Sequence, residues 1–209
     1  MTWARLASSY DVVARAYDAQ FVDELDGKPR DRELLATFAA SVGDPVIDLG
    51  CGPGQIGLVV SEHGRDVVGI DLSREMAHLA AGRLGTAIVA DLRALPITDR
   101  GIAAIVAFYS LIHVPRPELG AALRELHRVL RPGGQILLSA HEGTGEIGLD
   151  RFLDEPVPFV ATLFALDELT DACVAAGLDV TLAERRDPYP SEHPTTRLYV
   201  RARRRDLDT

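Results

Sequence analysis

Short apolar runs alternate with longer amphipathic segments through the middle of this 209-residue chain. Runs that are apolar along their whole length are typical of strands buried on both faces of a parallel sheet. Five such strands are predicted, at 45–50, 65–71, 86–91, 101–110 and 135–140. Helices are predicted between them at 55–64, 73–85 (with Ser73 as its cap and Gly85 as its stop) and 117–134. This alternation predicts a doubly wound α/β fold.

The two ends of the chain depart from this alternation. After a predicted helix at 167–177, strands are expected at 178–186 and 196–204, and the proline-rich loop between them is too short for a crossover helix. This pair should therefore be antiparallel. Before the first strand, helices are expected near 10–25 and 30–41, over the binding edge or beside the sheet. Right-handed crossovers place the C-terminal ends of the parallel strands along one edge, where open sheets bind ligands.

Composition and charge exclude several classes of function. The chain is 47% hydrophobic, enough for the core of one domain covering residues 1–209. Its net charge of -9 opposes binding to nucleic acid or to anionic membranes. The two cysteines, Cys51 and Cys173, form no disulfide framework and no metal-ligand spacing. With no signal-peptide pattern and no run of membrane-spanning length, a cytoplasmic protein is expected.

A glycine-rich turn follows the first predicted strand in the stretch VIDLGCGPG. Gly50, Gly52 and Gly54 allow positive φ and close approach of a ligand to the backbone, although a ligand-free strand-to-helix turn would use the same residues. A dinucleotide-binding turn would need a glycine at position 55, where the chain has Gln55. The turn alone therefore leaves its ligand open.

Three acidic residues at three consecutive strand ends indicate what kind of ligand the turn binds. Asp48 precedes the glycine turn, Asp71 ends the second strand and Asp91 ends the third. Each one alone is more often a turn residue, but Asp71 is placed to accept from a ribose diol and Asp91 from an adenine amine. An acid beside the turn suits a cationic ligand better than a pyrophosphate. S-adenosylmethionine has an ammonium, a sulfonium, a ribose diol and an adenine amine. The less favoured alternative is an NAD(P)-dependent oxidoreductase, against which Gln55, Asp48 and Asp91 argue.

The chain also resembles a known family in these same stretches. VIDLGCGPG, VVGIDLS, IVADLRALP, AFYSLIHVP and LHRVLRPGGQILLSA are similar to the successive motifs of class I S-adenosylmethionine-dependent methyltransferases, small-molecule Methyltransf_11/25 type. The resemblance covers roughly residues 10–200. It implies a seven-stranded Rossmann-like sheet, mostly parallel, with an antiparallel C-terminal strand inserted before the sixth. It also implies S-adenosyl-L-methionine as cofactor and S-adenosyl-L-homocysteine as product.

The resemblance further implies which residues hold the cofactor. The turn would face its methionine end, Asp71 its ribose, and Leu72 and Met76 its adenine. Pro53 stands where many members have Thr or Ser, which removes one amide donor. The full implied set of strand-end and turn residues is Asp48, Gly50, Cys51, Gly52, Asp71, Leu72, Met76, Asp91, Leu92, Phe108 and Tyr109.

An aromatic pair is expected to close the site. Tyr10 and Tyr17 lie seven residues apart, on one face of the first predicted helix. In similar proteins such tyrosines cover the cofactor, and an aromatic face beside a sulfonium is favourable by about 0.5–2 kcal/mol. Alternatively, the two tyrosines belong to the hydrophobic core and hold this helix against the sheet. Residues 1–43 are accordingly predicted to form a helical lid.

The acceptor side is less determined by the sequence. A base is needed only if the attacking atom carries a proton, and His113 is the best-placed candidate, ahead of His141. Segment 141–165 is long for a loop and is predicted to be an acceptor-side insertion, with Phe152 and Phe159 walling an apolar pocket or merely covering the sheet. The predicted substrate-binding residues are His113, His141, Phe152 and Phe159.

These observations predict methyl transfer to an oxygen or nitrogen atom of a small organic molecule, in specialised metabolism. A protein that binds the cofactor without methylating, as a sensor or a cyclase-like catalyst, is the alternative. The expected partner is a small-molecule acceptor, with no nucleic acid, membrane or metal, and the chain is expected to be a monomer or homodimer.

Overall fold

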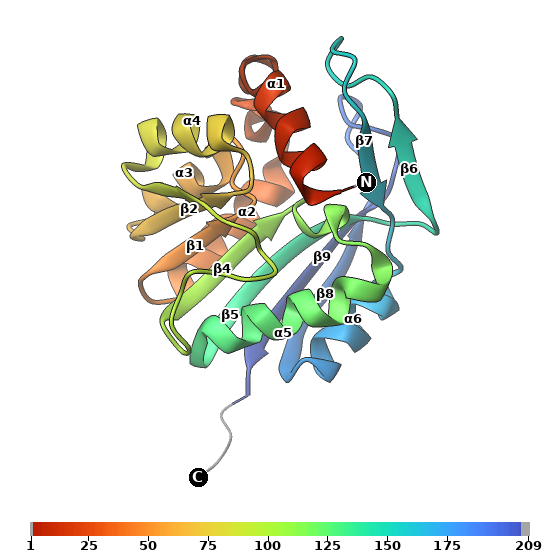
Figure 1. Cartoon of the computed structure of the whole chain (residues 1–209). Helices are drawn as coiled ribbons and strands as arrows, with labels where there is room; N and C mark the ends of the chain where they lie inside the picture. Colours follow the sequence, from red (N-terminus) through yellow and green to blue (C-terminus); the bar gives the residue numbers. More distant parts are fainter. Residues whose placement is uncertain (1, 206–209) are drawn as a thin grey trace.

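The computed structural model describes residues 2–205 and is built around one mixed β-sheet (Figure 1). Seven strands are hydrogen-bonded in the order β3-β2-β1-β4-β5-β9-β8. Their bounds are Val46–Leu49 (β1), Val67–Asp71 (β2), Ala87–Val89 (β3), Ile102–Phe108 (β4), Leu130–His141 (β5), Leu178–Arg186 (β8) and Arg197–Arg204 (β9). This arrangement is the doubly wound, seven-stranded Rossmann-like sheet that the sequence predicts.

The strand directions also agree with the prediction. The first five strands pair in parallel, β1 with β2 and β4, β2 with β3, and β4 with β5. β9 lies between β5 and β8 and is antiparallel to both. The connection from β8 to β9 spans only residues 187–196, so the chain has to return antiparallel to the strand it has just left.

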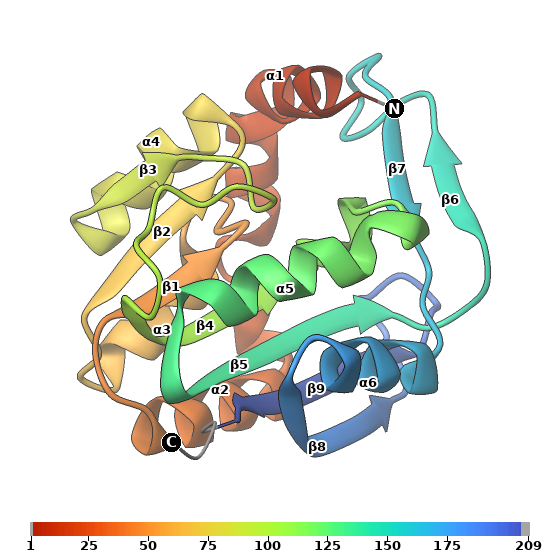
Figure 2. The ribbon, with the colours of Figure 1, turned by 60° about the horizontal axis from the view of Figure 1, so that its bottom comes forward.

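Helices cover both faces of the sheet, with α5 and α6 in front of it in Figure 2. On that face, Leu123 and Leu126 of α5 are fully buried in the larger core cluster. On the other face, Leu35 and Phe38 of α2 pack with residues of α3. The helix bounds are Trp3–Phe21 (α1), Pro29–Ser41 (α2), Gln55–Glu62 (α3), Arg74–Leu84 (α4), Leu119–Val129 (α5) and Leu166–Ala175 (α6), with short 3₁₀ turns at Glu24–Gly27 (η1), Leu111–His113 (η2) and Arg116–Glu118 (η3). Within residues 2–205 no helix has the length and apolar character of a membrane span.

Local signals in the sequence explain why α4 begins and ends where it does. The Ser73 side chain accepts a hydrogen bond of 3.2 Å from the Met76 N–H, which satisfies one of the free amides of the first turn. Gly85 ends the helix with a φ of 79°, a left-handed conformation that glycine adopts without strain. Both predicted boundaries of this helix are confirmed.

The predicted end of the helix at 117–134 is wrong. The helix ends at Val129, and Pro132-Gly133-Gly134, the last three residues of the predicted range, lie inside β5. The pairing register between β4 and β5 shifts at this point, and a proline is tolerated at such an irregularity near the start of a strand. Pro132 therefore marks a bulged strand start rather than the end of the helix.

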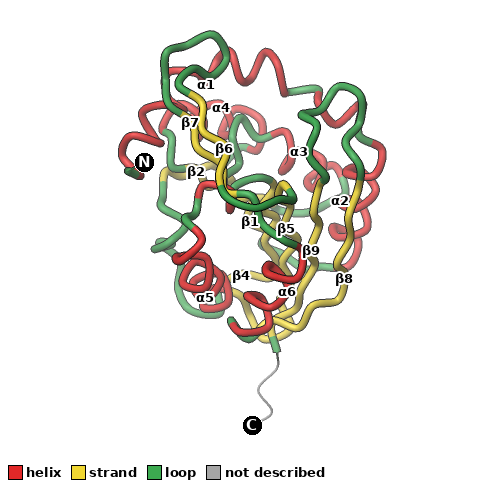
Figure 3. Tube along the Cα trace, turned by 90° about the vertical axis from the view of Figure 1, so that its right-hand side faces the viewer, coloured by secondary structure: helices red, strands yellow, loops and turns green. Residues whose placement is uncertain are grey.

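The insertion at 141–165 contains a hairpin that the sequence did not reveal. Its strands are β6 (Glu146–Leu149) and β7 (Phe159–Thr162), and they form a small sheet of their own. Four residues are too few for a polar-apolar alternation to be distinguished from a loop. Figures 1 and 3 show the hairpin beside α1, above the end of the sheet where the parallel strands terminate.

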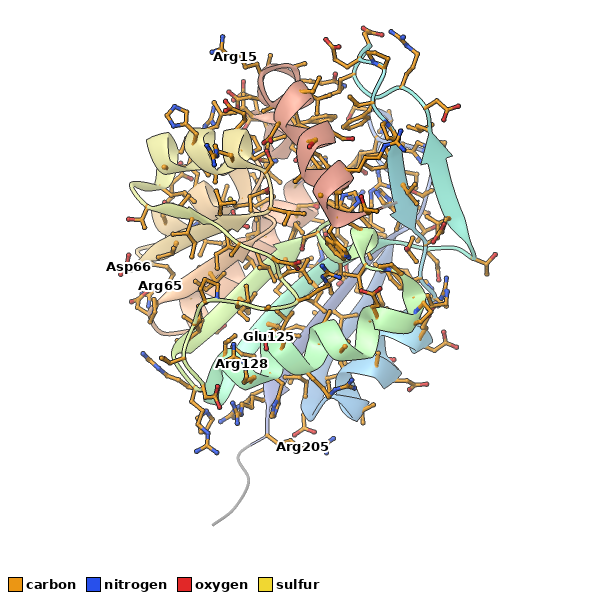
Figure 4. All side chains as sticks on the ribbon, in the orientation of Figure 1. Arg15, Arg65, Asp66, Glu125, Arg128 and Arg205 are labelled. Atoms are coloured by element: carbon orange, nitrogen blue, oxygen red, sulfur yellow. The ribbon has the colours of Figure 1, made fainter. Side chains whose placement is uncertain are left out.

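At the opposite end of the sheet, charged side chains are paired with the chain itself. Arg128 of α5 lies next to Glu125 (Figure 4) and donates to the carbonyl oxygens of Leu95 and Ile97. Glu125 in turn accepts from the Leu95 N–H at 2.7 Å. These contacts fasten the segment between β3 and β4 to α5. A ligand site is therefore expected at the other end of the sheet.

Candidate functional site

A cavity lies under α1, at the C-terminal ends of β1, β2 and β4. Its empty volume is about 680 Å³, which includes space that is open to solvent. We call it the main cavity. Its lining residues come from α1, the glycine turn and the strand ends, and they are Trp3, Leu6, Tyr10, Tyr17, Leu49, Gly50, Gly52, Ile70, Asp71, Leu72, Met76, Ala90, Leu92, Phe108, Tyr109, Ser110 and His113.

The glycine turn and Asp71 form one side of the main cavity. Asp71 accepts hydrogen bonds from the Gly52 N–H at 2.9 Å and from the Ser73 N–H at 2.8 Å. Burial raises the pKa of this carboxyl to about 6, against those hydrogen bonds. Gly50 has a φ of 67°, and a Cβ at this position would come within 2.3 Å of the Ser110 Cβ. The turn therefore depends on glycine at position 50, and it brings backbone and carboxylate together at the cavity.

Asp48 and Cys51 lie behind the cavity lining. Asp48 is fully buried and accepts from the Gly57 N–H at 2.8 Å, and burial raises its pKa to about 7. Gly57 has no room for a side chain, because a Cβ would come within 2.8 Å of the Asp48 carboxylate. Cys51 packs its sulfur toward Gly69. Both residues support the glycine turn from the side away from the cavity. Their predicted contact with a cofactor stays a prediction.

Asp91 is also outside the lining, two residues after β3 ends at Val89. Its carboxylate is held by Arg93, whose Nη2 donates at 2.7 Å. The guanidinium of Arg93 lies 4.2 Å from the ring centroid of Trp3, a cation–π contact. Leu92, its neighbour, does line the cavity. The predicted bond from Asp91 to an adenine amine stays a prediction, and it would have to share this carboxylate with Arg93.

Helix α1 covers the main cavity and begins at Trp3, seven residues before the predicted start. Tyr10 and Tyr17 both line the cavity, with their rings 6.2 Å apart. On the same helix, Asp11 accepts from the Ser73 hydroxyl at 2.6 Å and from the Glu75 N–H at 3.2 Å. The helix is thus tied to the N-terminus of α4, and its aromatic face is turned to the cavity. The second helix of the predicted lid, α2, packs against α3 instead.

His113 lies in η2, in the cavity wall opposite the glycine turn. Its Nδ1 is 3.0 Å from the Val160 carbonyl oxygen, and its Nε2 is 2.8 Å from the Tyr10 hydroxyl. Because a carbonyl only accepts, Nδ1 carries the proton and Nε2 accepts from Tyr10. Burial lowers the pKa of the ring to about 4, so the imidazole is neutral at physiological pH. The Tyr10 hydroxyl therefore occupies the accepting lone pair of His113 Nε2.

The end of β4 contributes polar atoms that have no protein partner. The Tyr109 hydroxyl and the Ser110 hydroxyl are both buried and make no hydrogen bond to any described residue. Tyr109 also has a φ of 54°, which is uncommon for a residue other than glycine. Its ring is stacked on His141 at 4.9 Å. Buried polar groups are normally hydrogen-bonded, so the Ser110 hydroxyl is a candidate contact for a ligand, whereas the charges that act on the Tyr109 hydroxyl are those of Asp31, Arg197, Glu192 and Arg186.

His141 does not reach the cavity. It lies behind Tyr109, where its Nδ1 is 2.8 Å from the Thr195 hydroxyl, and burial lowers its pKa to about 3. Its predicted substrate contact has no support from this position and stays a prediction. Phe152 and Phe159 are stacked on each other at 4.7 Å and contact the Tyr10 ring edge-on, at a small apolar gap beside α1.

Sequence reasoning missed several cavity residues. Trp3 and Leu6 lie before the stretch in which a helix was expected, and Ser110 was treated only as a strand end. The signal for the first two was present, because Trp3, Leu6, Tyr10 and Tyr17 fall at helical spacing. No pattern indicated Ser110, whose exposure to the cavity depends on how η2 follows β4.

Comparison with known proteins identifies the family. A methyltransferase-domain family model matches residues 46–134. Malonyl-[acyl-carrier protein] O-methyltransferase of Serratia marcescens is 30% identical over 189 residues, which cover 88% of this chain and 72% of that protein. The biotin biosynthesis bifunctional protein BioHC of Saccharophagus degradans is 32% identical over 142 residues, 65% of this chain but only 24% of that longer protein.

A solved structure supports the same assignment at the level of the fold. It is the 1,6-didemethyltoxoflavin-N1-methyltransferase of Burkholderia thailandensis with bound S-adenosylhomocysteine, which has a TM-score of 0.74 at 23% identity and covers 97% of this chain and 88% of its own. The fold, the family model and the relative from Serratia agree with the glycine turn and strand-end acids. The chain belongs to the class I S-adenosylmethionine-dependent methyltransferases.

Proposed function

We propose that this chain transfers the methyl group of S-adenosylmethionine to an oxygen or nitrogen atom of a small organic molecule, in specialised metabolism. The observation that carries the proposal is the cover over the main cavity. Tyr10 and Tyr17 of α1 lie across it, and Phe152 and Phe159 of the insertion pack on Tyr10. An acceptor enclosed by the chain's own lid has to be compact, which favours a small molecule over a macromolecule.

The cavity lining fits the cofactor. The half-buried Asp71 carboxylate lines the cavity and has lone pairs left to accept from a ribose diol, beyond the two backbone amides it already binds. Leu72 and Met76 offer apolar surface for adenine. The Ser110 hydroxyl supplies a buried polar atom without a protein partner. These residues, rather than Asp48 or Cys51, are proposed as direct contacts of the cofactor.

When bound, S-adenosylmethionine supplies an electrophilic methyl group. The chain's contribution is alignment and exclusion of water, the two effects that dominate such a transfer. The Tyr10 and Tyr17 rings line the cavity, where the π face of an aromatic ring is a favourable neighbour for a cation. The Tyr10 hydroxyl and His113 Nε2 form a path by which a proton of the acceptor could leave the cavity.

The names of the relatives support O- or N-methylation without fixing the acceptor. The protein from Serratia marcescens is an O-methyltransferase for a malonyl-[acyl-carrier protein], and the structure from Burkholderia thailandensis is an N-methyltransferase for a small heterocycle. Both transfer a methyl group to a heteroatom. We extend only this shared feature to the present chain.

The test combines binding and turnover. Calorimetry with S-adenosylhomocysteine should show binding, and methyl-labelled S-adenosylmethionine should label at least one member of a panel of small amines, phenols and alcohols. The Asp71→Asn variant serves as the binding-deficient control. Binding without transfer across the whole panel would contradict the proposal and favour the alternative, a sensor or a cyclase-like catalyst that retains the cofactor.

A further inference from the structure

A second cavity adjoins the main one on the far side of His113. It encloses about 450 Å³ of empty space, part of it open to solvent, and we call it the side cavity. It shares Trp3, Leu6 and His113 with the main cavity. The remaining lining residues come from the start of α1, the turn after η2 and the hairpin, and they are Thr2, Pro115, Glu146, Val160 and Thr162. Figure 1 shows the start of α1 next to β7, two of the elements that line this cavity.

The charges around the two cavities are one-sided. Among the described residues, no lysine or arginine lines either cavity, whereas Asp71 lines the main one and Glu146 the side one. Glu146 is exposed at the hairpin, where its backbone is paired with Thr162, and its side chain has no hydrogen-bond or ion-pair partner among the described residues. The cation next to Pro115, Arg116, is already bound to Glu168. An anionic ligand would therefore meet an acidic residue in each cavity and no lysine or arginine among the described lining residues.

The polar groups of the side cavity lead to the same conclusion. Thr162 donates its hydroxyl to the Val114 carbonyl, and His113 donates its Nδ1–H to Val160. Both of these donors are already used, which leaves the Thr2 hydroxyl and the Trp3 indole N–H, two neutral donors that do not compensate the full charge of a desolvated carboxylate. An amine or hydroxyl needs an acceptor, which Glu146 provides. Trp3, Leu6 and Val160 supply apolar walls for a flat body.

We propose that the methyl acceptor approaches through the side cavity, and that it is a neutral or cationic amine or hydroxyl compound with a flat apolar body, which Glu146 binds through its donor group. This inference rests on the proposed function, because it concerns the acceptor of the same reaction. It also separates the chain from the relative in Serratia marcescens, whose named substrate, a malonyl group, carries a carboxylate. Glu146 is then the residue that determines specificity for charge.

Three probes of nearly equal size test the charge preference directly. 2-Phenylethylamine, 2-phenylethanol and phenylacetate share a phenyl ring and differ in being cationic, neutral and anionic. They are titrated by calorimetry into the protein saturated with S-adenosylhomocysteine, which fills the main cavity and leaves the side cavity. We expect the amine to bind about fivefold more tightly than phenylacetate, the size of effect given by one partly solvated charge.

Two variants with matched controls locate the effect. Glu146→Lys should reverse the order of the amine and phenylacetate, whereas Glu155→Lys, an exposed acid of the same insertion outside the cavities, should leave it unchanged. Val160→Phe should fill the side cavity and weaken all three probes about tenfold with unchanged affinity for S-adenosylhomocysteine. Val174→Phe, at an exposed position of α6, is its control.

The outcomes decide the proposal separately from the proposed function. Phenylacetate binding as well as the amine, an unchanged order in Glu146→Lys, or no binding of any probe at millimolar concentration would each overturn the inference about the acceptor. These binding results do not depend on turnover. The proposed function fails by a different result, the absence of labelled methyl transfer to any amine, phenol or alcohol in the panel.

Discussion

Tyr109 borders two polar clusters that are built in opposite ways. On one side is the main cavity, where Asp71 and the Ser110 hydroxyl meet no cation among the lining residues. On the other side is a group of buried, mutually paired charges, which we call the ion network. Its members are Lys28, Asp31, Arg186, Glu192 and Arg197.

Glu192 is the centre of the ion network. Its carboxylate lies 2.8 Å from Arg186, 3.3 Å from Lys28 and 3.6 Å from Arg197. Burial opposes its ionisation, but the hydrogen bond from Arg186 and the charges of Arg197 and Lys28 outweigh burial and lower its pKa to about 2. Asp31 is similarly held by Arg186 and by the Tyr199 hydroxyl at 2.9 Å.

The two clusters differ in role, because the ion network stabilises the fold whereas the main cavity has polar atoms that are free to bind a ligand. In the ion network each charge has a partner within the chain, so the network fastens the loop at 187–196 to α2 and needs no ligand. In the main cavity the polar atoms are oriented before any partner is present, which is the arrangement that binding and catalysis require. Perturbing the first cluster should change stability, and perturbing the second should change binding.

The largest expected effect is in the ion network. Glu192→Ala removes the shared partner of three cations and should lower the free energy of unfolding by about 3–5 kcal/mol, because a buried charge without a partner is strongly destabilising. Urea unfolding measures the loss. Affinity for S-adenosylhomocysteine should change by less than about threefold.

The control for this variant is Glu142→Ala, which breaks an ion pair with the half-exposed Arg185 and should lower the free energy of unfolding by less than about 1 kcal/mol. Equal losses in the two variants would show that the ion network contributes no more than a surface pair.

The next effect concerns the main cavity. Asp71→Asn replaces one acceptor oxygen by an NH₂ group, which cannot accept from the Gly52 or Ser73 N–H or from a ribose hydroxyl. The dissociation constant of S-adenosylhomocysteine should rise about 100-fold, or about 2.7 kcal/mol, in calorimetry. Asp48→Asn keeps an acceptor oxygen for Gly57 and should change this constant less than about threefold. A larger effect of Asp48→Asn would return Asp48 to the predicted contacts of the cofactor.

The pH dependence of stability and of affinity for S-adenosylhomocysteine should distinguish the two clusters further. Burial raises the pKa of Asp71 from its ordinary value of 3.8 to about 6. The folded state therefore binds a proton more tightly than the unfolded state, and ionising Asp71 lowers the stability of the ligand-free protein as the pH rises from 3.8 through 6. Affinity for S-adenosylhomocysteine should change the other way and fall about tenfold per pH unit below 6, because a ribose diol needs the ionised carboxylate.

Calorimetry at pH 5 in buffers of different ionisation enthalpy would measure the proton that leaves Asp71 on binding. Asp71→Asn should abolish this release, whereas Asp48→Asn should retain it. A release of protons that persists in Asp71→Asn would assign the titration to another group. Glu192 of the ion network stays ionised in this range because its pKa is near 2, whereas burial raises the pKa of Asp31 above its ordinary value.

The smallest expected effect is at the lid. Tyr10→Phe removes the hydroxyl that donates to His113 and should lower the free energy of unfolding by about 1 kcal/mol, or about 2–4 °C in Tm. Tyr17→Phe should lower it less, because the Tyr17 hydroxyl has no hydrogen-bond partner among residues 2–205. Thermal unfolding followed by circular dichroism compares the two. A larger shift for Tyr17→Phe would contradict the assignment of the stabilising bond to Tyr10.

Much of the fold was determined by local sequence. The apolar runs and the caps Ser73 and Gly85 predicted the central strands and α4, because buried strands and helix ends depend on residues close in the chain. The short connection between β8 and β9 determined their antiparallel pairing for the same reason. The glycine turn and Asp71 could likewise be placed in the cavity, since parallel strands all end at one edge.

Only the tertiary structure decided which polar groups are free to meet a ligand. Asp48, Asp71 and Asp91 look equivalent in sequence, yet one is bound to Gly57, one lines the cavity and one is held by Arg93. Whether a carboxylate faces a cavity or a partner depends on side chains that come from distant segments. Such contacts leave no periodic pattern in the sequence, and neither did the side cavity between the start of α1 and the hairpin.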